Sequence, residues 1–473
     1  MKLILLAITA YLCVQNCWGQ MSPSGPININ GQSGTVIQNL HITSTSGNCV
    51  TITSSSNITI QNSEIGPCGA ADGSGDGNGI SIAASNGVNI YDNYIHPEIK
   101  TASSCCDHRD GIFGSGGNSN INIQGNVIAY GETNIEFNGG TNANLNVIGN
   151  FLLNPRGPAD PRGQNFQCWG ADASNTCINV TVQNNYALSS TDTSKYLYPE
   201  DQEDSINFGF TNTATVTGNF ITGGHSQSGC GLIADDAANN ITFQNNRLLN
   251  TGQCGIGIAD GTKPIVQSNW VYNTNPVSGG GNTAIYVWKQ YSSPCGPTTI
   301  ANNIADEVRQ DGSHSGYWDG GNCNATTSGN MFDTTADPTL TASSTFNPPP
   351  IPPNPKNCVV TSPYTNNTSS GLPQCSGSSG GNPPPPPPSP PQITSATTAS
   401  GRVGTAFTYQ ITATNNPGSF NASGLPAGIT VNVGSGLISG KPTVSGTYNV
   451  TVKATNASGT GSAALKITIS KRR

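Results

Sequence analysis

Apolar and polar residues alternate in short runs along most of this chain. Pairs of apolar residues spaced two apart occur in GISIA, TNIEF, DSINF and CGIGIA, and Ile80 with Ile82 is one such pair. A period of two predicts β-strands, because successive side chains of a strand point to opposite faces. No helical pattern of about ten residues or more follows the N-terminal segment. The predicted fold class is therefore all-β.

An asparagine recurs after these strands, each time followed within three residues by large apolar side chains. Successive instances lie 23 to 35 residues apart. The shortest gaps indicate a unit of about 23 residues, and the longer gaps indicate the same unit with an inserted loop. A repeat of this length predicts a solenoid. The instances are Asn62, Asn93, Asn126, Asn150, Asn185, Asn219, Asn246, Asn269, Asn303 and Asn330.

A second short strand lies between the first strand and the asparagine, as in NGVNIYDN and NNITFQNN. Two or three strands in so short a coil predict a right-handed parallel β-helix over residues 27–345. Stacked asparagine side chains should then hydrogen-bond from coil to coil. On this repeat, the chain resembles the parallel β-helix superfamily typified by pectate lyases. The resemblance implies the fold and leaves the function open.

The pattern changes beyond the solenoid. FNPPPIPPNP and GNPPPPPPSPP predict a semi-rigid polyproline linker over residues 346–391. Alternating strands in AFTYQITAT, TYNVTVKAT and ALKITIS then predict a small antiparallel β-sandwich over residues 392–470. The string GLPAGITVNVGSGLISGKPTVSGTYNVTVKAT resembles the Ig-like module, related to cadherin-like domains, of exported bacterial proteins. That resemblance implies an adhesion or spacer unit, from which activity should not be inferred.

The N-terminus indicates export. Met1 and Lys2 precede an apolar run from Leu3 to Val14, and Gly19 ends a segment typical of a cleavage site, so residues 1–19 are predicted to be a signal peptide. A retained N-terminal anchor is the alternative. No later stretch is long and apolar enough to predict a transmembrane segment.

Twelve of the 14 cysteines lie beyond this segment, and an even number in an exported protein predicts disulfides. Cys230 and Cys254 each precede the first inward strand residue of adjacent coils by two residues, which predicts that they stack and pair. Proximity in sequence favours Cys49 with Cys68, Cys168 with Cys177, and Cys358 with Cys375. The adjacent Cys105 and Cys106 are not expected to pair together, so one is expected to reach Cys295 or Cys323. No CxxC motif supports the alternative of a metal site.

Charge is distributed unevenly between the two parts. Residues 392–473 carry seven basic and no acidic residues, whereas the rest of the mature chain carries all 25 acids and has a formal charge of −15. An acidic solenoid is not expected to bind nucleic acid. It would also repel a polyuronate unless calcium bridged the two, so calcium is a possible cofactor, with Asp201 and Asp236 as candidate ligands.

The first group of candidate catalytic residues lies immediately before the strand GIFGS. His108 would act as a base, Arg109 would hold a carboxylate, and Asp110 would orient the imidazole. Asp204 precedes its own strand in the same way as Asp110, which favours the alternative of a turn-capping role for both.

A second candidate, Glu136, is expected on the outward face because Ile135 and Phe137 point inward. Phe113 and Asn207 are expected to lie near it on that face as substrate-binding residues. A purely solvated Glu136 is the alternative.

The third group comprises Asp204, His225 and Asp235. Their acid pairs and Gly-His segment are similar to those of polygalacturonase-type hydrolases. The order of these motifs differs from that family, and an Arg-Ile-Lys string is missing. The expected register also places Asp204 and Asp235 at opposite ends of adjacent strands, slightly too far apart for a hydrolytic pair.

Aromatic residues further along complete the candidate site. Tyr286 and Trp288 are expected on the outward face, with Lys289 beside them, where the rings could stack on sugars. Together these residues predict an exported, monomeric, carbohydrate-active protein, either a polysaccharide lyase or a glycoside hydrolase, tethered by its Ig-like module. The alternative is a non-catalytic glycan-binding or adhesion protein of the cell surface.

Overall fold

The computed structural model describes residues 21–69, 77–97, 110–155, 163–172, 174–189, 203–224, 226–333 and 391–471, together with strands β35 (Cys358–Val359) and β36 (Gln374–Cys375). Short gaps fall at 415–416, 418, 434–435 and 457–458. The chain divides into two units, Met1–Ser379 and Gly380–Arg473. The described residues contain strands and turns but no α-helix, as the period of two predicted. The predicted signal peptide, Cys105 and Cys106 lie outside the described residues.

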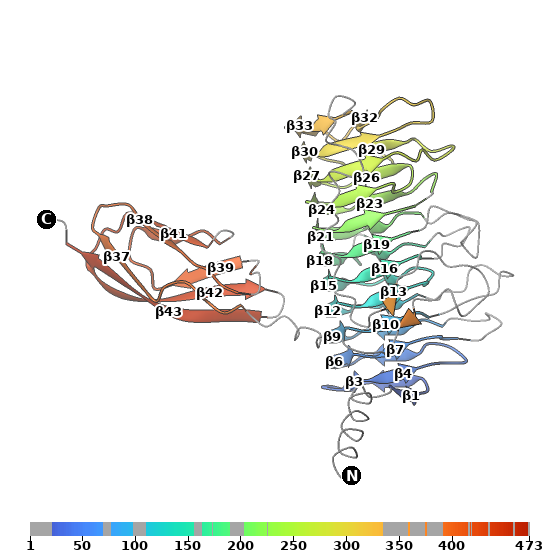
Figure 1. Ribbon diagram of the computed structural model, residues 1–473, viewed down its shortest axis with the longest axis horizontal. Coiled ribbons are helices and arrows are strands. Elements are labelled where there is room, and N and C mark those ends of the chain that lie inside the picture. The colour runs from blue at the N-terminus through green and yellow to red at the C-terminus, as the bar shows by residue number, and fades with distance from the viewer. Residues whose placement is uncertain are drawn as a thin grey trace, which may run out of the picture. The chain divides into compact units, whose positions relative to one another are not determined.

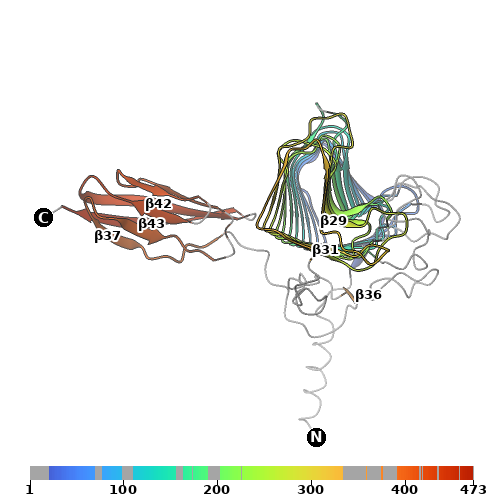
Figure 2. The same cartoon turned by 90° about the horizontal axis from the view of Figure 1, so that it is seen from above.

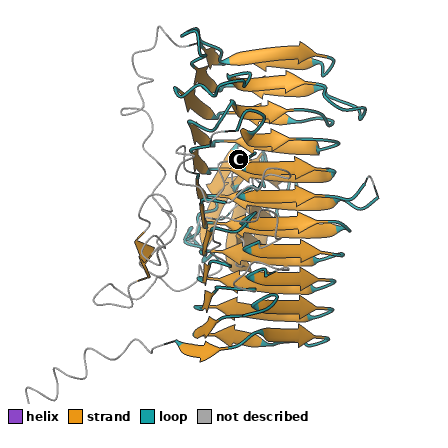
Figure 3. Cartoon of the chain, turned by 90° about the vertical axis from the view of Figure 1, so that its right-hand side faces the viewer, coloured by secondary structure: helices purple, strands orange, loops and turns teal. Residues whose placement is uncertain are grey.

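The first unit is a parallel β-helix whose coils stack strand upon strand (Figures 1 and 3). Three parallel sheets, here named A, B and C, run along it, and Figure 2 shows the coils superimposed when viewed from above. Sheet A has 12 strands: β1 (Ser22–Ser24), β4 (Leu40–Ile42), β7 (Glu64–Ile65), β10 (Tyr94–Ile95), β13 (Val127–Ala129), β16 (Phe151–Leu153), β19 (Tyr186–Leu188), β22 (Phe220–Thr222), β25 (Arg247–Leu249), β28 (Trp270–Asn273), β31 (Ile304–Glu307) and β34 (Met331–Phe332).

Sheets B and C complete each coil, and both have 11 strands. Sheet B comprises β2 (Ile27–Asn30), β5 (Val50–Thr53), β8 (Ile80–Ala83), β11 (Ile112–Ser115), β14 (Ile135–Asn138), β17 (Phe166–Trp169), β20 (Ile206–Gly209), β23 (Cys230–Ala234), β26 (Cys254–Ile258), β29 (Thr283–Trp288) and β32 (Tyr317–Gly321). Sheet C comprises β3 (Val36–Gln38), β6 (Ser56–Gln61), β9 (Asn86–Tyr91), β12 (Ser119–Gln124), β15 (Asn142–Ile148), β18 (Cys177–Gln183), β21 (Thr211–Thr217), β24 (Asn239–Gln244), β27 (Ile265–Gln267), β30 (Thr298–Ala301) and β33 (Ala325–Ser328). Alternate residues of all three sheets point inward and form one continuous apolar core.

A buried asparagine ladder joins the coils between sheets C and A, as predicted. Asn150 shows the pattern: its Oδ1 accepts from both the backbone N–H and the Nδ2 of Asn126, each at 3.0 Å. Its own Nδ2 donates to the Ile123 carbonyl at 2.9 Å and to Asn185 Oδ1 at 3.0 Å. Nine of the predicted asparagines occupy this ladder, namely Asn93, Asn126, Asn150, Asn185, Asn219, Asn246, Asn269, Asn303 and Asn330.

The tenth predicted member, Asn62, lies one residue before the ladder, and its assignment was wrong. Ser63 occupies the ladder position instead, because its backbone N–H donates to Asn93 Oδ1. Asn62 takes the preceding turn position, where the backbone φ is +50°. Asp92 and Asn184 adopt the same left-handed conformation in later coils, which asparagine and aspartate tolerate better than other non-glycine residues.

Four disulfides join described cysteines of the solenoid. The predicted pairs Cys230–Cys254, Cys49–Cys68 and Cys168–Cys177 are confirmed. Cys295 pairs with Cys323, so the expectation that one of them bonds Cys105 or Cys106 was wrong. Cys295 and Cys323 lie in successive coils, and stacking of those coils brings the two side chains together. Cys358 lies opposite Cys375 in the antiparallel pair β35–β36, and their bond remains a prediction.

The second unit is a β-sandwich. One sheet has the order β37 (Thr398–Arg402), β43 (Gly459–Ser470), β42 (Gly446–Asn456) and β39 (Ser419–Ser423), and the other has β38 (Phe407–Gln410), β41 (Leu437–Gly440) and β40 (Ile429–Val431). The inward residues of the predicted strands, such as Val450 and Ile467, form its core. Not every pair is antiparallel as expected, because β37 runs parallel to β43. In the described part of the chain, no helix is long and apolar enough to cross a membrane.

Candidate functional site

The structure describes some of the predicted site residues and not others. His108, Arg109, Asp201 and His225 lie outside the described residues, so their roles remain predictions. The remaining candidates belong to sheet B or to the turns at its ends.

Asp110 belongs to a hydrogen-bonded series at the start of the sheet B strands. Its Oδ1 accepts from the Thr133 N–H of the next coil at 3.0 Å, and its own N–H donates to Asn78 Oδ1 at 2.8 Å. Only 2% of Asp110 is exposed. These contacts support the alternative that the sequence left open, a turn-capping role for this aspartate.

Glu136 points outward from β14, as predicted, because its neighbours Ile135 and Phe137 are buried. Phe113 is its register partner on β11, and both side chains are half-buried. Glu136 Oε1 accepts from Asn138 Nδ2 at 2.8 Å. Asn207 lies two strands away in the same outward row, with Gln167 between.

An acid pair on sheet B is the most unusual feature of this face. Asn207 Nδ2 donates to Asp204 Oδ2 at 2.7 Å and to Asp235 Oδ2 at 3.3 Å, so these two carboxyl oxygens lie within about 6 Å of each other. The expectation that the two carboxyls lie too far apart was therefore wrong. Their backbones do stand at opposite ends of adjacent strands, but side chains lean along a strand, and here they converge on Asn207.

The environment of the pair favours protonation. Asp204 is 2% and Asp235 is 8% exposed. Burial raises the pKa of Asp204 well above its usual range, and the nearby carboxylates of Glu203 and Asp235 raise it further. Burial also raises the pKa of Asp235, although hydrogen bonds from Tyr291 and Asn207 favour its charged form and oppose that rise.

Asp204 also has a structural contact. Its Oδ1 accepts from the Cys230 N–H of the next coil at 2.7 Å, as Asp110 accepts from Thr133. One oxygen of Asp204 therefore caps a turn while the other faces Asp235 through Asn207. Asn207 Oδ1 is buried and has no hydrogen-bond partner among the described residues.

Tyr286 borders the pair but is not exposed. It points outward from β29, yet only 6% of it is accessible, because its ring lies over Gly257 of the preceding coil. A Cβ at Gly257 would come 2.7 Å from Tyr286 Cε1 and Cζ. Gln290 Nε2 donates to the Tyr286 hydroxyl at 3.0 Å. The prediction that Tyr286 stacks on sugar rings was therefore wrong, since the ring is already covered.

Tyr291 is a site residue that the sequence analysis missed. It hydrogen-bonds to Asp235 and is 39% exposed. It lies in the loop after β29, beyond any strand pattern, so only its closeness to the predicted Lys289 could have drawn attention to it. Lys289 itself is half-buried and near enough to Asp260 to favour that carboxylate's charged form.

Two exposed tryptophans lie further along the outward face of sheet B. Trp288 is 44% and Trp318 is 43% exposed, and their ring centroids are 5.8 Å apart in an edge-to-face arrangement. A Cβ at Gly320 would come 2.5 Å from Trp288 Cδ1, so this glycine makes room for the ring. Exposed large aromatics of this kind are suited to stacking on sugar rings, and that role for Trp288 stays a prediction.

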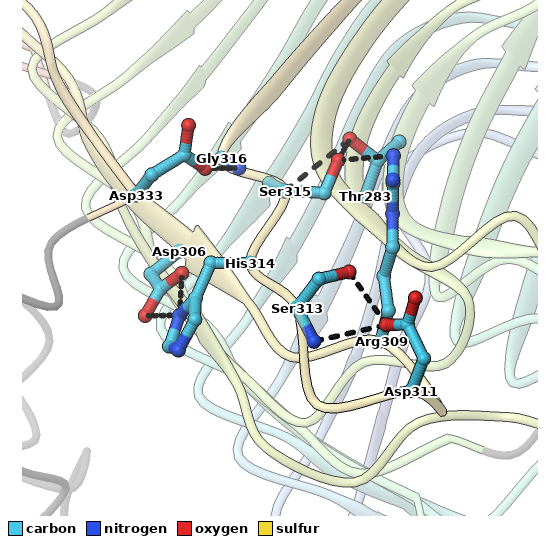
Figure 4. A network of polar contacts seen from close by, with 9 residues as sticks. All are labelled: Thr283, Asp306, Arg309, Asp311, Ser313, His314, Ser315, Gly316 and Asp333. Carbon is cyan, nitrogen blue, oxygen red and sulfur yellow. Dashed lines mark hydrogen bonds and ion pairs between the residues drawn. The ribbon is translucent and has the colours of Figure 1, made fainter.

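A second polar cluster, on the segment after β31, is shown in Figure 4. His314 Nδ1 lies 2.8 and 2.9 Å from the two carboxylate oxygens of Asp306. Arg309 donates to Ser315 Oγ at 2.9 Å, and Ser315 Oγ donates to Thr283 Oγ1 at 2.8 Å. The contacts to Asp306 and Thr283 join the segment to the end of the solenoid, which gives the cluster a structural role.

The predicted calcium ligands receive no support from the described residues. Asp236 Oδ1 accepts from Ser293 Oγ at 2.9 Å, and Asp201 is not described. Within the described ranges, no three His, Cys, Asp or Glu side chains are arranged to hold a metal ion.

Comparisons with known proteins identify the second unit. Residues 390–470 match the family described as "Putative Ig domain". No curated protein matches the chain. Among solved structures, a putative α-galactosidase/melibiase and a putative α-galactosidase, both from Bacteroides fragilis NCTC 9343, match at 32% and 35% identity with TM-scores of 0.17.

Each of these two matches covers 17% of this chain and 18% of the other, so the chain spans less than a fifth of the length of either protein. At that extent, neither likeness carries an argument about activity. The chain thus combines a parallel β-helix with a C-terminal member of the putative Ig domain family.

Proposed function

We propose that this protein is an exported glycoside hydrolase that cleaves a polysaccharide over the outward face of sheet B. The single observation that carries the proposal is the pair Asp204 and Asp235, whose carboxyl oxygens lie within about 6 Å of each other through their shared donor Asn207. Glycoside hydrolysis uses two carboxyl groups about 5 to 9.5 Å apart, and the shorter spacing belongs to enzymes that retain the anomeric configuration.

The two environments suit different roles. Asp204, whose pKa burial raises the more strongly, fits the protonated acid that donates its proton to the leaving glycosidic oxygen. Asp235, which Tyr291 and Asn207 help to keep charged, fits the nucleophile that forms a covalent glycosyl ester. Water then attacks the ester while Asp204 accepts its proton, and both carboxyls return to their initial states.

Binding would involve the groups around the pair. Tyr291 is the exposed partner of Asp235, so a substrate would meet it first. Trp288 and Trp318 would stack on sugar rings further along the chain of the glycan.

Export is part of the proposal. Four disulfides among the described cysteines are typical of proteins that fold in oxidising compartments. The Ig-like unit would then hold the protein at a surface, as the resemblance to exported modules implies.

A non-catalytic glycan-binding protein is the second candidate. It is favoured by the hydrogen bond from the Cys230 N–H to Asp204, because a turn cap alone can account for that aspartate. The exposed tryptophans would serve binding equally well without catalysis.

A substrate panel separates these functions. The purified protein is incubated with pectin, alginate, hyaluronan and neutral glycans, while new reducing ends and unsaturated products are measured in parallel. The hydrolase proposal predicts reducing ends without ultraviolet absorbance. Asp235→Asn should lower the rate by at least about a hundredfold, whereas Asp311→Asn, an exposed acid that hydrogen-bonds Ser313, should leave it unchanged. Unsaturated products would instead support a lyase, and no product on any glycan would support the binding protein.

A further inference from the structure

The outward face of sheet C differs from the rest of the solenoid because its strands carry no ionisable acidic or basic side chain. None of the 11 strands of this sheet contains Asp, Glu, Lys, Arg or His. The strands of sheet A contain Arg247 and Asp306, and those of sheet B contain Glu136. An acidic body therefore has one uncharged flank.

The flank consists of two parallel rows of outward side chains. The first row runs from Val36 to Thr326 and contains only threonine and asparagine apart from Val36 and Ile265. The second row runs from Gln38 to Ser328 and is mainly glutamine, with three apolar or aromatic exceptions. Hydroxyl and carboxamide groups therefore repeat about every 4.8 Å along the solenoid and about 6.6 Å across it.

Hydrogen bonds within the rows hold parts of this array in place. Asn122 donates to Asn89 at 2.8 Å, and Asn146 donates to Asn122 at 2.9 Å. Gln267 donates to Gln244 at 2.9 Å in the second row. Side chains fixed in this way lose little conformational freedom when they bind a partner.

These properties narrow the class of partner. Nucleic acids and anionic membranes require basic residues, which this face lacks. A stable protein interface would need an apolar centre, whereas the rows are mostly polar. A partner with closely repeating neutral hydroxyl groups could instead form many weak hydrogen bonds at once, and such bonds gain strength by being linked.

We propose that the outward face of sheet C attaches the protein to an ordered, uncharged polysaccharide. The inference rests on the carbohydrate class of the proposed function and adds a second surface, distinct from the acid pair on sheet B. It makes sheet C an anchoring surface that holds the protein on an insoluble substrate.

Adsorption of the full chain to microcrystalline cellulose and to chitin tests this proposal. The variant Thr215→Glu with Thr242→Glu places two carboxylates on adjacent strands of the first row, where attachment would have to desolvate them. Thr222→Glu is the matched control, since Thr222 lies in the same coil as Thr215 but on sheet A. Thr299→Glu, at an exposed position of the first row, replaces the double variant if that variant fails to fold.

The expected result is that the native protein and Thr222→Glu adsorb equally, while the sheet C variant loses at least tenfold in partition onto at least one of the two solids. Equal adsorption of all three proteins would overturn the proposal, and would assign any binding to another surface such as the Ig-like unit. Failure of the native protein to adsorb to either solid would also overturn it. Asp235→Asn distinguishes the two proposals, because it should lose hydrolysis of soluble glycans and still adsorb.

Discussion

Asp204 and Asp235 come from successive coils and share one hydrogen-bond donor, the side-chain nitrogen of Asn207. Two nearly enclosed carboxyl groups so close together cannot both ionise readily, because burial and mutual repulsion each disfavour the charged form. The pair lowers the stability of the fold when both carboxyl groups are charged. Its presence on an outward face therefore favours a functional role.

The two functions of Asp204 can be separated by substitution. Asp204→Asn retains an oxygen that accepts from the Cys230 N–H, whereas Asp204→Ala leaves that buried N–H unpaired. We expect alanine to be less stable than asparagine by about 1 to 3 kcal/mol, and both variants to lose activity. Chemical denaturation measures the difference. Equal stability of the two variants would show that the cap contributes nothing.

The ring of Tyr286 should be sensitive to the residue beneath it. Gly257→Ala would place a methyl group 2.7 Å from Tyr286 Cε1, so the ring must move. We expect a loss of about 1 to 3 kcal/mol in unfolding free energy. The double variant with Tyr286→Ala should show a much smaller additional cost from the methyl group. Additive effects of the two substitutions would contradict this account of the contact.

The contribution of the asparagine ladder to stability can be tested with two substitutions in one coil. Asn150→Ala removes a completely buried amide and leaves the Asn126 N–H and the Ile123 carbonyl without their partner, at about 1 to 3 kcal/mol for each group. Asn146→Ala removes an outward amide that water can replace, so it should cost less than about 1 kcal/mol. Denaturation midpoints compare the two. If Asn146→Ala is as damaging as Asn150→Ala, the ladder is not what stabilises the stack.

Glu307 should make stability depend on pH. It is 1% exposed, its Oε2 accepts from Asn273 Nδ2 at 2.9 Å, and burial raises its pKa well above the usual value. The folded state therefore binds this proton more tightly than the unfolded state, so stability is greatest below about pH 4.3 and falls as the pH rises toward the raised pKa.

Glu307→Gln keeps the shape of the side chain and cannot ionise. Its unfolding free energy should fall less than that of the native protein between about pH 4.3 and neutral pH, and it should be the more stable protein at pH 7. Parallel slopes for the two proteins across this range would show that Glu307 does not titrate as described.

The fold could be predicted because its signals are local and repeated. Ile80 with Ile82 and the recurring Asn150 setting each follow from the period of the strand and of the coil. Asn62 was misplaced because the sequence QNSEI offers an asparagine at the turn and a serine at the ladder, and both residues suit their positions. A pattern based on residue type alone cannot distinguish them.

The repeat also accounts for four Asn-x-Thr sequences of this chain. Asn57, Asn179, Asn240 and Asn324 all adopt a left-handed conformation immediately before the first inward residue of a sheet C strand. Two residues later, each coil presents a threonine of the outward row. The Asn-x-Thr motif is therefore generated by the coil itself at these four positions.

The site was less predictable than the fold. Strand register predicts only the positions of Cα atoms, and it places the backbones of Asp204 and Asp235 at opposite ends of adjacent strands. Their side chains nevertheless lean toward Asn207. Tyr291 lies in a loop without periodicity, and the burial of Tyr286 depends on the absent side chain of Gly257. Such features depend on side-chain direction and space, which the strand pattern does not contain.

The stereochemistry of cleavage tests the central claim most directly. A carboxyl separation near the shorter limit predicts that hydrolysis retains the anomeric configuration of the sugar. Proton NMR of the first product formed by the native protein, recorded before mutarotation, should show the same anomer as the substrate. Accumulation of the opposite anomer, or no product from any glycan that binds, would contradict the assignment of Asp204 and Asp235 as the catalytic pair.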